Sequence, residues 1–244
     1  MIEAEHLLKR FGSLTAVNDV SFRVMPGEVV GFLGANGAGK STTMRLLTGS
    51  LLADSGEAHL DGHNIANNRQ AAQQLIGYLP ESASGFPQLT VQDFLTFAGE
   101  ARGLWGKVLS RAIGIVSEQV DLQPALHRRM SELSKGWRQR AWFAQAMLHD
   151  PPILILDEPT DGLDPNQKDK TRALIRDVSR EKAIIFSSHI LEEAEELCER
   201  VVIITDGRVV FDGPTREIAD DWGRLAPAFR RLTKSAGEIP GANL

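Results

Sequence analysis

Hydrophobic and polar positions alternate in short runs at the start of the chain. Residues 2–33 hold three such runs, separated by Gly12-Ser13 and by Pro26-Gly27, and this alternation is typical of strands joined by turns. The third run is almost continuously apolar and ends at a glycine-rich loop, 34–42. A helical pattern follows the loop and extends to about Thr48. The chain is therefore predicted to open with three strands, a loop and a helix.

The middle of the chain changes from a mixed to a helical pattern. From Thr90 to Leu148 the apolar positions recur at helical spacing, and no strand pattern interrupts them. Residues 89–148 are therefore predicted to be a helical subdomain, inserted into an α/β core made of 1–88 and 149–235. The elements expected here are a strand at 55–62, a helix at 67–74, a strand at 75–79 and helices beginning at Thr90, Leu104 and Lys135.

Strand character returns at 153–156, an unbroken apolar run. Such a run is typical of a central parallel strand that helices cover on both faces. The last residues, 236–244, contain Gly, Pro and Asn without periodicity and are expected to form a loose tail. The remaining expected elements are a helix at 165–180, a strand at 183–186, a helix at 191–198 and a β pair, 201–205 with 208–211, that turns at Asp206-Gly207.

Composition excludes several classes of protein. With 244 residues and 42% hydrophobic content, the chain can bury a full core as one domain, 1–235. The net charge of −5 gives no reason to expect a nucleic-acid partner. A single cysteine, Cys198, excludes an internal disulfide and is expected to be buried. No segment approaches about 18 consecutive apolar residues, and the acidic N-terminus lacks the apolar part of a signal peptide, so we expect a cytoplasmic protein.

The loop 34–42 is the first candidate site. Its sequence matches G-x-x-x-x-G-K-[ST], the phosphate-binding loop, and it lies between a predicted strand and a predicted helix. Glycines let consecutive backbone N–H groups face an anion, and the helix N-terminus adds partial positive charge. Lys40 supplies a full charge for the β- and γ-phosphates, and Ser41 offers a hydroxyl to a nucleotide-bound Mg²⁺. The competing interpretation is a glycine-rich surface turn, which the flanking strand and helix disfavour.

Two adjacent carboxylates form the second candidate site. Asp157 and Glu158 follow the buried strand at its C-terminal end, the edge where α/β folds place their ligands. Asp157 can hold Mg²⁺ directly or through water, and Glu158 can polarise the attacking water. Such a pair can also be an ordinary helix N-cap region. The phosphate loop earlier in the chain favours the catalytic interpretation.

A third pattern begins the helix expected at 135. Taken alone, Ser134 is a helix cap, and Gly136 permits close approach of another chain segment. The order of phosphate loop, L-S-x-G helix start, Asp-Glu strand end and a later Ser-Ser-His resembles the ATP-binding subunit of an ABC transporter. The resemblance covers residues 2 to about 233, and L-S-x-G is its specific element. It implies an α/β fold with a RecA-like P-loop NTPase core, an antiparallel β portion and the helical insertion.

The resemblance also implies roles for the matched residues. Glu158, His189 and Lys40 would be the catalytic groups. Ser134 and Gly136 would contact the ATP held by the opposite subunit, so that the complete site exists in a head-to-tail homodimer. The nucleotide would be bound by Phe11, Gly34, Asn36, Gly37, Ala38, Gly39, Lys40, Ser41, Thr42, Ser134, Gly136 and Asp164, and Mg²⁺ by Ser41, Glu81 and Asp157.

Two of these assignments have simpler alternatives when the residue is considered by itself. Phe11 would stack on adenine in the family, but an aromatic at this position can also cover the edge of a sheet. His189 would contact the γ-phosphate, but a lone histidine there can also be a polar helix cap. The loop 162–164 matches the family's loop that crosses the dimer interface.

Three residues depart from the family pattern. Glu81 lies where the family usually has Gln, Lys135 replaces the first glycine of L-S-G-G, and Trp137 replaces the Gln that follows. A carboxylate at 81 can still bind Mg²⁺, but it brings negative charge toward the phosphates. These changes, with the G-Y-L-P-E form at 77–81 and the tail at 229–233, resemble the branch whose partners are ABC-2-type export permeases.

The sequence therefore predicts an ATPase subunit that drives export through separate membrane permease subunits, on the inner face of the cell membrane. One alternative is a soluble ABC ATPase of translation or DNA repair, but such chains usually carry two ATPase domains or a long coiled-coil insertion. Another is a nucleotide-binding regulator without hydrolysis, against which Lys40, Glu158 and His189 argue.

Overall fold

A computed structural model describes residues 1–82 and 84–237 of the chain. Two sheets organise it: a four-stranded antiparallel sheet in the order β2-β1-β4-β5, and a six-stranded sheet in the order β10-β9-β3-β8-β7-β6. In the larger sheet β9, β3, β8, β7 and β6 run parallel, and β10 pairs antiparallel with β9. The strands are β1 (Ile2–Phe11), β2 (Leu14–Val24), β3 (Val29–Leu33), β4 (Ser55–Leu60), β5 (His63–Asn64), β6 (Ile76–Leu79), β7 (Ile153–Asp157), β8 (Ala183–Ser188), β9 (Arg200–Thr205) and β10 (Arg208–Pro214).

Side-chain alternation along the central strands creates two hydrophobic cores. Ile153 and Ile155 of β7 enter the core shared with the antiparallel sheet, whereas Leu154 and Leu156 enter the core on the helical side. All five residues of β7 are buried, because both faces of a parallel sheet are covered. Burial of each aliphatic side chain contributes about 1.5–3 kcal/mol, so this strand is firmly held and its end is a rigid support for Asp157 and Glu158.

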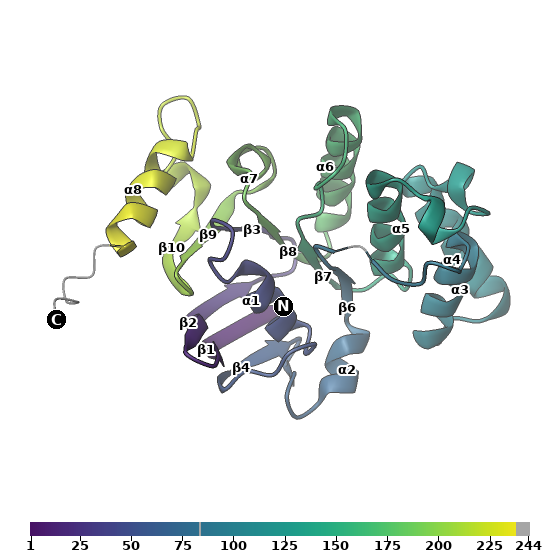
Figure 1. Cartoon of the computed structure of the whole chain (residues 1–244), viewed down its shortest axis with the longest axis horizontal. Coiled ribbons are helices and arrows are strands. Elements are labelled where there is room, and N and C mark those ends of the chain that lie inside the picture. The colour runs from purple at the N-terminus through teal and green to yellow at the C-terminus, as the bar shows by residue number, and fades with distance from the viewer. Residues whose placement is uncertain (83, 238–244) are drawn as a thin grey trace.

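Helices cover the sheets and form a separate group at one end of the molecule. Figure 1 shows α3, α4 and α5 beside β6, and α8 at the opposite end. Thr90 caps α3, accepting from the Asp93 amide at 3.1 Å, where the sequence predicted a helix to begin. The helices are α1 (Lys40–Leu47), α2 (Arg69–Gln74), α3 (Val91–Ala101), α4 (Gly106–Gln119), α5 (Lys135–Met147), α6 (Pro165–Ser179), α7 (Leu191–Leu197) and α8 (Ala226–Gly237), with single-turn 3₁₀ helices at Gln123–Ala125, Met130–Glu132 and Thr215–Glu217.

The helical group is seated on the core through β6 and α5. A Cβ at Gly77 would lie only 1.9 Å from the Ala146 carbonyl oxygen, so glycine is required for this approach. His149, just beyond α5, lies 3.1 Å through Nε2 from the Ile76 carbonyl oxygen. The last turn of α5 is therefore fixed directly against β6.

The expected elements are confirmed, and further ones are present. Sequence patterns predicted neither the two-residue strand β5, nor the helix α8, nor the three single-turn 3₁₀ helices. Because α8 continues to Gly237, residues 236 and 237 of the expected tail belong to a helix. Residues 238–244 lie outside the described part of the chain. Within the described residues, no helix is both long enough and apolar enough to cross a membrane.

Candidate functional site

The phosphate loop begins at the C-terminal end of β3 and leads into α1. Its tight path requires glycine at 39, where φ is +109° and a Cβ would lie 2.4 Å from the Ala16 carbonyl oxygen. The loop opens onto a cavity of about 480 Å³. Of the predicted site residues, the cavity is lined by Phe11, Asn36, Gly37, Gly39, Lys40, Ser41, Thr42, Glu81 and Glu158.

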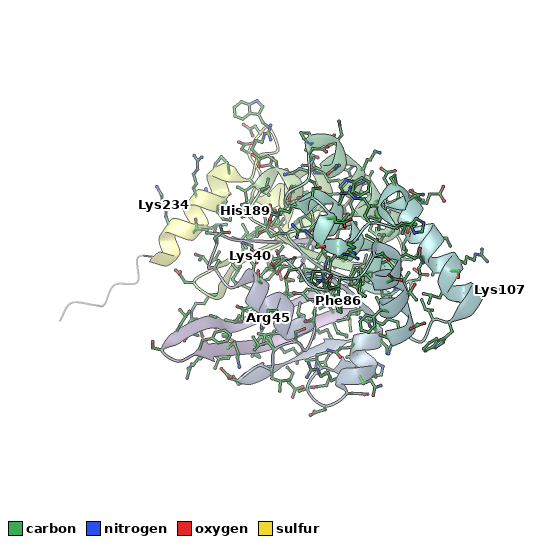
Figure 2. All side chains as sticks on the ribbon, turned by 45° about the vertical axis from the view of Figure 1, so that its right-hand side comes forward. Lys40, Arg45, Phe86, Lys107, His189 and Lys234 are labelled. Carbon is green, nitrogen blue, oxygen red and sulfur yellow. The ribbon has the colours of Figure 1, made fainter. Side chains whose placement is uncertain are left out.

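Lys40, Glu158 and His189 form a line of contacts beside this loop. Lys40 is 6% exposed, and its Nζ donates to the Gly34 carbonyl oxygen at 2.8 Å and lies 3.6 Å from Glu158 Oε1. The same Glu158 oxygen lies 3.0 Å from His189 Nδ1. Figure 2 labels Lys40 and His189 in the central region of the molecule. The first residue of α1 and the residues that directly follow β7 and β8 are thus brought within reach of one another, which supports the predicted catalytic assignment.

The backbone at Glu158 is itself unusual. Its φ of +51° lies in the left-handed region that non-glycine residues rarely adopt, and such strain persists only where the surroundings hold it. The Glu158 amide donates to the Ser187 hydroxyl at 3.2 Å, and Gln139 Nε2 donates to the Glu158 carbonyl oxygen at 3.1 Å. Gln139 is 2% exposed and belongs to α5, so the helix that begins at Lys135 contacts the backbone of Glu158.

Two carboxylates approach the Ser41 hydroxyl. Its hydroxyl lies 3.1 Å from Glu81 Oε2 and 3.2 Å from Asp157 Oδ1. Burial raises the pKa of Asp157, hydrogen bonds from Ser187 and Ser41 oppose this rise, and the negative charges of Glu81 and Glu158 add to it. A cation would relieve this crowding of negative charge. One hydroxyl and one or two carboxylates fit a nucleotide-bound Mg²⁺, which takes its other ligands from phosphates and water.

No group of three or more His, Cys, Asp or Glu side chains among the described residues is arranged to hold a metal. This finding is compatible with the Ser41 arrangement, because that set includes a hydroxyl and relies on the nucleotide for further oxygens. Mg²⁺ at this position would therefore depend on bound nucleotide.

Phe11 lies at the mouth of the cavity and is 47% exposed. Lys9 Nζ lies 5.8 Å from the centre of its ring. Sequence reasoning missed other residues that line the cavity: Leu14, Thr15, Ala16, Asp206 and Gly207. The Gly207 amide donates to the Ala38 carbonyl oxygen at 3.0 Å, so the β9–β10 turn supports the phosphate loop. The turn itself was predicted, but local sequence gives no sign of its distant partner.

Ser134, Gly136 and Asp164 do not line the phosphate cavity. Ser134 caps α5 by accepting from the Trp137 amide at 3.4 Å, and Asp164 caps α6 by accepting from the Gln167 amide at 3.0 Å. A Cβ at Gly136 would lie 3.2 Å from the Gly162 carbonyl oxygen, so the start of α5 packs against the loop after Glu158.

Two residues that differ from the family pattern, Lys135 and Trp137, make contacts within their own chain. Lys135 Nζ pairs with Asp161 Oδ2 at 2.6 Å, which ties the start of α5 to the loop after Glu158. The Trp137 ring stacks with the Arg140 guanidinium at 3.7 Å. Both side chains are therefore engaged within the chain that carries them.

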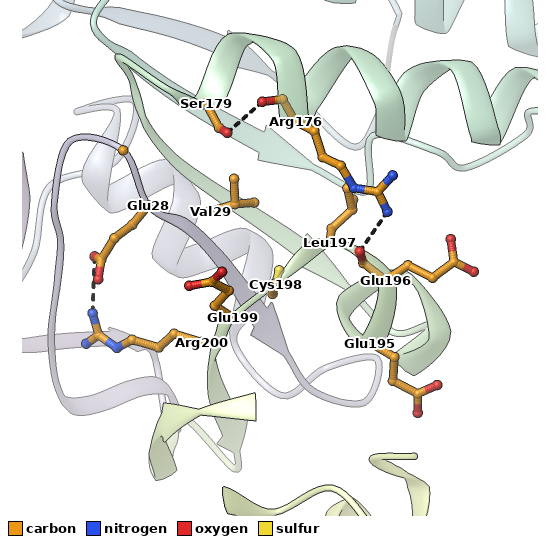
Figure 3. A pocket seen from close by; sticks show the side chains of 11 residues that line it. Glu28, Val29, Arg176, Ser179, Glu195, Glu196, Leu197, Cys198, Glu199 and Arg200 are labelled. Atoms are coloured by element: carbon orange, nitrogen blue, oxygen red, sulfur yellow. Dashed lines mark hydrogen bonds and ion pairs between the residues drawn. The ribbon is translucent and has the colours of Figure 1, made fainter. Parts of the chain in front are cut away.

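A second cavity, of about 470 Å³, lies at the N-terminal ends of β3 and β9 (Figure 3). It is bounded by the start of β3 at Glu28 and by the junction of α7 and β9, including Glu195 and Arg200. The phosphate loop follows the other end of β3, so this cavity is separate from the predicted site. Cys198 borders it but is 6% exposed, and burial raises the pKa of its thiol.

A family profile described as ABC transporter matches residues 17–161, more than half of the chain. The chain belongs to the ABC transporter ATP-binding family. An uncharacterized ABC transporter ATP-binding protein, YxlF of Bacillus subtilis (strain 168), is 39% identical over 89% of this chain and 72% of the relative. Nod factor export ATP-binding protein I of Paraburkholderia xenovorans (strain LB400) is 37% identical over 91% of this chain and 74% of the relative. A solved ATP-binding subunit of an ABC transporter shares 29% identity, with a TM-score of 0.87 over 96% of this chain and 99% of that one.

These similarities establish the general function of the chain. It is an ATPase subunit of a transporter with a P-loop NTPase fold. The residue roles remain predictions, which the contacts described above support. Sequence reasoning missed Gln139, which donates to the Glu158 carbonyl oxygen, and Glu193 of α7, a buried carboxylate that accepts from Thr160 and Ser188. Glu193 is one of four glutamates in the segment 192–196, and only the tertiary structure distinguishes it from the other three.

Proposed function

We propose that this chain is the ATP-hydrolysing subunit of an exporter, and that it works as a homodimer with separate ABC-2-type permease subunits at the cytoplasmic face of the membrane. The line of contacts from Lys40 through Glu158 to His189 is the observation that carries the catalytic part of the proposal. Residues 1–235 act as one ATPase domain, with 89–148 as its helical subdomain.

In this proposal the chain's own groups perform three tasks. The loop amides and Lys40 bind the triphosphate, and Glu158 accepts a proton from the attacking water. His189 contacts the γ-phosphate and, through its 3.0 Å contact, fixes the orientation of Glu158. Attack by water breaks the bond between the γ-phosphorus and the oxygen bridging to the β-phosphate, which yields ADP and inorganic phosphate. Phe11 stacks on the adenine at the mouth of the cavity.

Mg²⁺ is the proposed companion of ATP, and Ser41, Asp157 and Glu81 would hold it. When bound, it would neutralise part of the negative charge of the phosphates. The convergence of these oxygens at 3.1–3.2 Å supports the assignment.

A homodimer accounts for the residues that lie outside the phosphate cavity. ATP-binding subunits of this family dimerise, and in a two-fold arrangement Ser134 and Gly136 of one copy close over the nucleotide of the other. The loop with Asp164 then crosses the interface. Binding of ATP adds contacts between the subunits, and hydrolysis removes them, so that the dimer opens.

Export through a permease is supported by the relatives. Subunits of this family pair with membrane permeases, and the Nod factor relatives are named as export proteins. The curated relatives are named as transporter proteins, which disfavours a role in translation or DNA repair.

The test of catalysis is the isosteric change Glu158→Gln. It keeps the shape of the side chain but removes the base, so turnover should fall on the order of 100-fold or more. ATP should still bind and should hold the variant as a dimer in size-exclusion chromatography. Glu57→Gln, at an exposed position of β4, is the matched control and should behave as the wild type. Unchanged phosphate release by Glu158→Gln would exclude Glu158 as the base.

The transport part has a separate test. The chain should be purified gently from native membranes and its companions identified. Recovery of a multi-span permease supports the proposal, whereas ribosomes or DNA in its place would favour the soluble alternative.

A further inference from the structure

Glu193 of α7 is a buried carboxylate with no role in the chemistry described above. It is 1% exposed, and three side chains from other elements reach it. Thr160 and Ser188 donate hydroxyl hydrogen bonds to its two oxygens, the latter at 2.8 Å, and Lys168 Nζ lies 3.5 Å away. A buried carboxylate is costly unless its oxygens are satisfied, and here they are.

The partners of Glu193 flank the two catalytic groups in sequence. Thr160 lies two residues after Glu158, and Ser188 immediately precedes His189. Both partners are buried, at 2% and 0% exposure. Ser188 Oγ also accepts from the Ile190 amide at 3.0 Å, so the same hydroxyl shapes the backbone turn that carries His189. Glu193 therefore joins the segment after the catalytic acid to the segment that presents the histidine.

The connection matters because the conformations of Glu158 and His189 both depend on neighbouring residues. Glu158 has its backbone in the left-handed region and needs neighbours to hold it there. His189 has a side chain that is 45% exposed, so packing alone does not fix it. Their mutual distance of 3.0 Å depends on how the two segments are placed relative to each other. The Glu158 amide bond to Ser187 holds the two segments at their strand ends, and the Thr160–Glu193–Ser188 bridge is a second buried polar contact between them, beyond those ends.

We propose that Glu193 is a positioning residue for ATP hydrolysis, which acts through Thr160 and Ser188 to hold Glu158 and His189 in register. The inference rests on the proposed function.

Glu195 provides a matched control on the same helix. It lies two residues further on, on the other side of α7, at the cavity of Figure 3. Its side chain is 9% exposed and accepts from the Leu225 amide at 2.7 Å and from Arg224 at 3.0 Å. Glu195→Gln thus removes a comparably buried, hydrogen-bonded charge without touching the catalytic segments.

The experiment measures steady-state ATP hydrolysis by the full-length chain. Glu193→Gln is expected to lower kcat about tenfold and to leave KM for ATP within about twofold, because the phosphate loop is untouched while the catalytic groups lose their register. Glu195→Gln is expected to keep the wild-type kcat. Thr160→Val should reproduce the loss, and Thr160→Ser, which keeps the hydroxyl, should restore kcat. The double variant Glu193→Gln with Thr160→Val should be no slower than either single variant.

Three outcomes overturn the proposal: a wild-type kcat in Glu193→Gln, a loss that Glu195→Gln shares equally, or additive losses in the double variant. If Glu193→Gln fails to fold, Thr160→Val and Thr160→Ser decide alone, since equal kcat values in these two variants reject the bridge. Failure of the proposed function can be distinguished from failure of this proposal, because the wild-type chain would then show no ATP hydrolysis.

Discussion

Glu81 places a negative charge beside the hydroxyl that is proposed to bind Mg²⁺. Its Oε2 lies 3.1 Å from Ser41 Oγ, and Asp157 approaches the same hydroxyl at 3.2 Å. The family pattern has a neutral amide here, which offers an oxygen without the charge. In this chain the carboxylate is expected to strengthen the hold on the metal and to weaken the hold on the triphosphate.

Variants at Glu81 should separate these two effects. Glu81→Ala removes the oxygen, and the Mg²⁺ concentration for half-maximal hydrolysis should rise by about 3- to 10-fold. Glu81→Gln keeps an oxygen and removes the repulsion, so KM for ATP should fall while the dependence on Mg²⁺ changes little. Titrations of ATPase activity with Mg²⁺ and with ATP measure both quantities. If Glu81→Ala leaves the Mg²⁺ dependence and the permease-coupled activity unchanged, the metal assignment for Glu81 is wrong.

Among single residues, those with a self-contained motif were predictable. The phosphate loop and the Asp-Glu pair each combine a residue pattern with a strand end, so their chemistry can be argued locally. Glu193 could not be predicted in this way, because its neighbours Glu192 and Glu196 have the same residue type and remain exposed. Which acid turns inward depends on the contacts of α7 with Thr160 and Ser188, and these contacts form only in the folded chain.

At the scale of elements, local patterns predicted the long strands and helices because each carries its own periodicity. Helix α8 was missed although its 12 residues make it longer than α1, α2 and α7, which were predicted. Its apolar residues Phe229 and Leu232 pack on the core beside β9 and β10, and this contact forms only in the folded chain. The contact between α5 and β6 also could not be predicted from local sequence. Gly77 looks like an ordinary glycine in a strand, yet glycine is required there because Ala146 of α5 lies against it.

The α5–β6 contact should make stability depend on pH. Burial and, secondarily, the charge of Arg102 lower the pKa of His149 from 6.5 to about 4. Between pH 6.5 and pH 4 the unfolded chain therefore binds a proton at His149 that the folded chain does not bind. The free energy of unfolding should fall between pH 6.5 and pH 4, by about 1–2 kcal/mol after allowance for the solvent that reaches this side chain, and should change no further below pH 4 through this group.

Thermal unfolding of two histidine variants between pH 4 and pH 8 checks this expectation. His149→Gln removes the titrating group and should flatten the pH dependence relative to the wild type. His127→Gln, at an exposed position, is the control and should retain the wild-type slope. Equal slopes in the wild type and in His149→Gln would show that His149 is not responsible.

At the scale of the whole molecule, the proposed site is divided between two copies. The phosphate cavity contains Lys40 and Glu158, whereas Ser134 and Gly136 lie at the start of α5 outside it. The separation is a property of the fold, since β3 and α5 belong to different parts of the chain: the α/β core and the helical group. A head-to-tail dimer brings the two halves together twice, once for each nucleotide.

Mixing two inactive variants tests this division. Lys40→Ala disables the phosphate loop, and Ser134→Glu places a negative charge where the γ-phosphate of the partner's ATP would lie. Each variant alone should hydrolyse little ATP. A mixed dimer has one site with both defects and one intact site, so an equal mixture should recover about a quarter of wild-type activity. If each copy holds a complete site within itself, mixing restores nothing.

The buried thiol of Cys198 has a practical consequence. Thiol reagents attack the thiolate, and at 6% exposure with a raised pKa this cysteine is shielded from them in the folded protein. A cysteine introduced at an exposed position, such as Trp222 with its 84% exposure, would therefore accept a fluorophore or spin label selectively. Two labelled copies would form a matched pair of probes, whose separation reports each opening and closing of the dimer during turnover without any change to the native core.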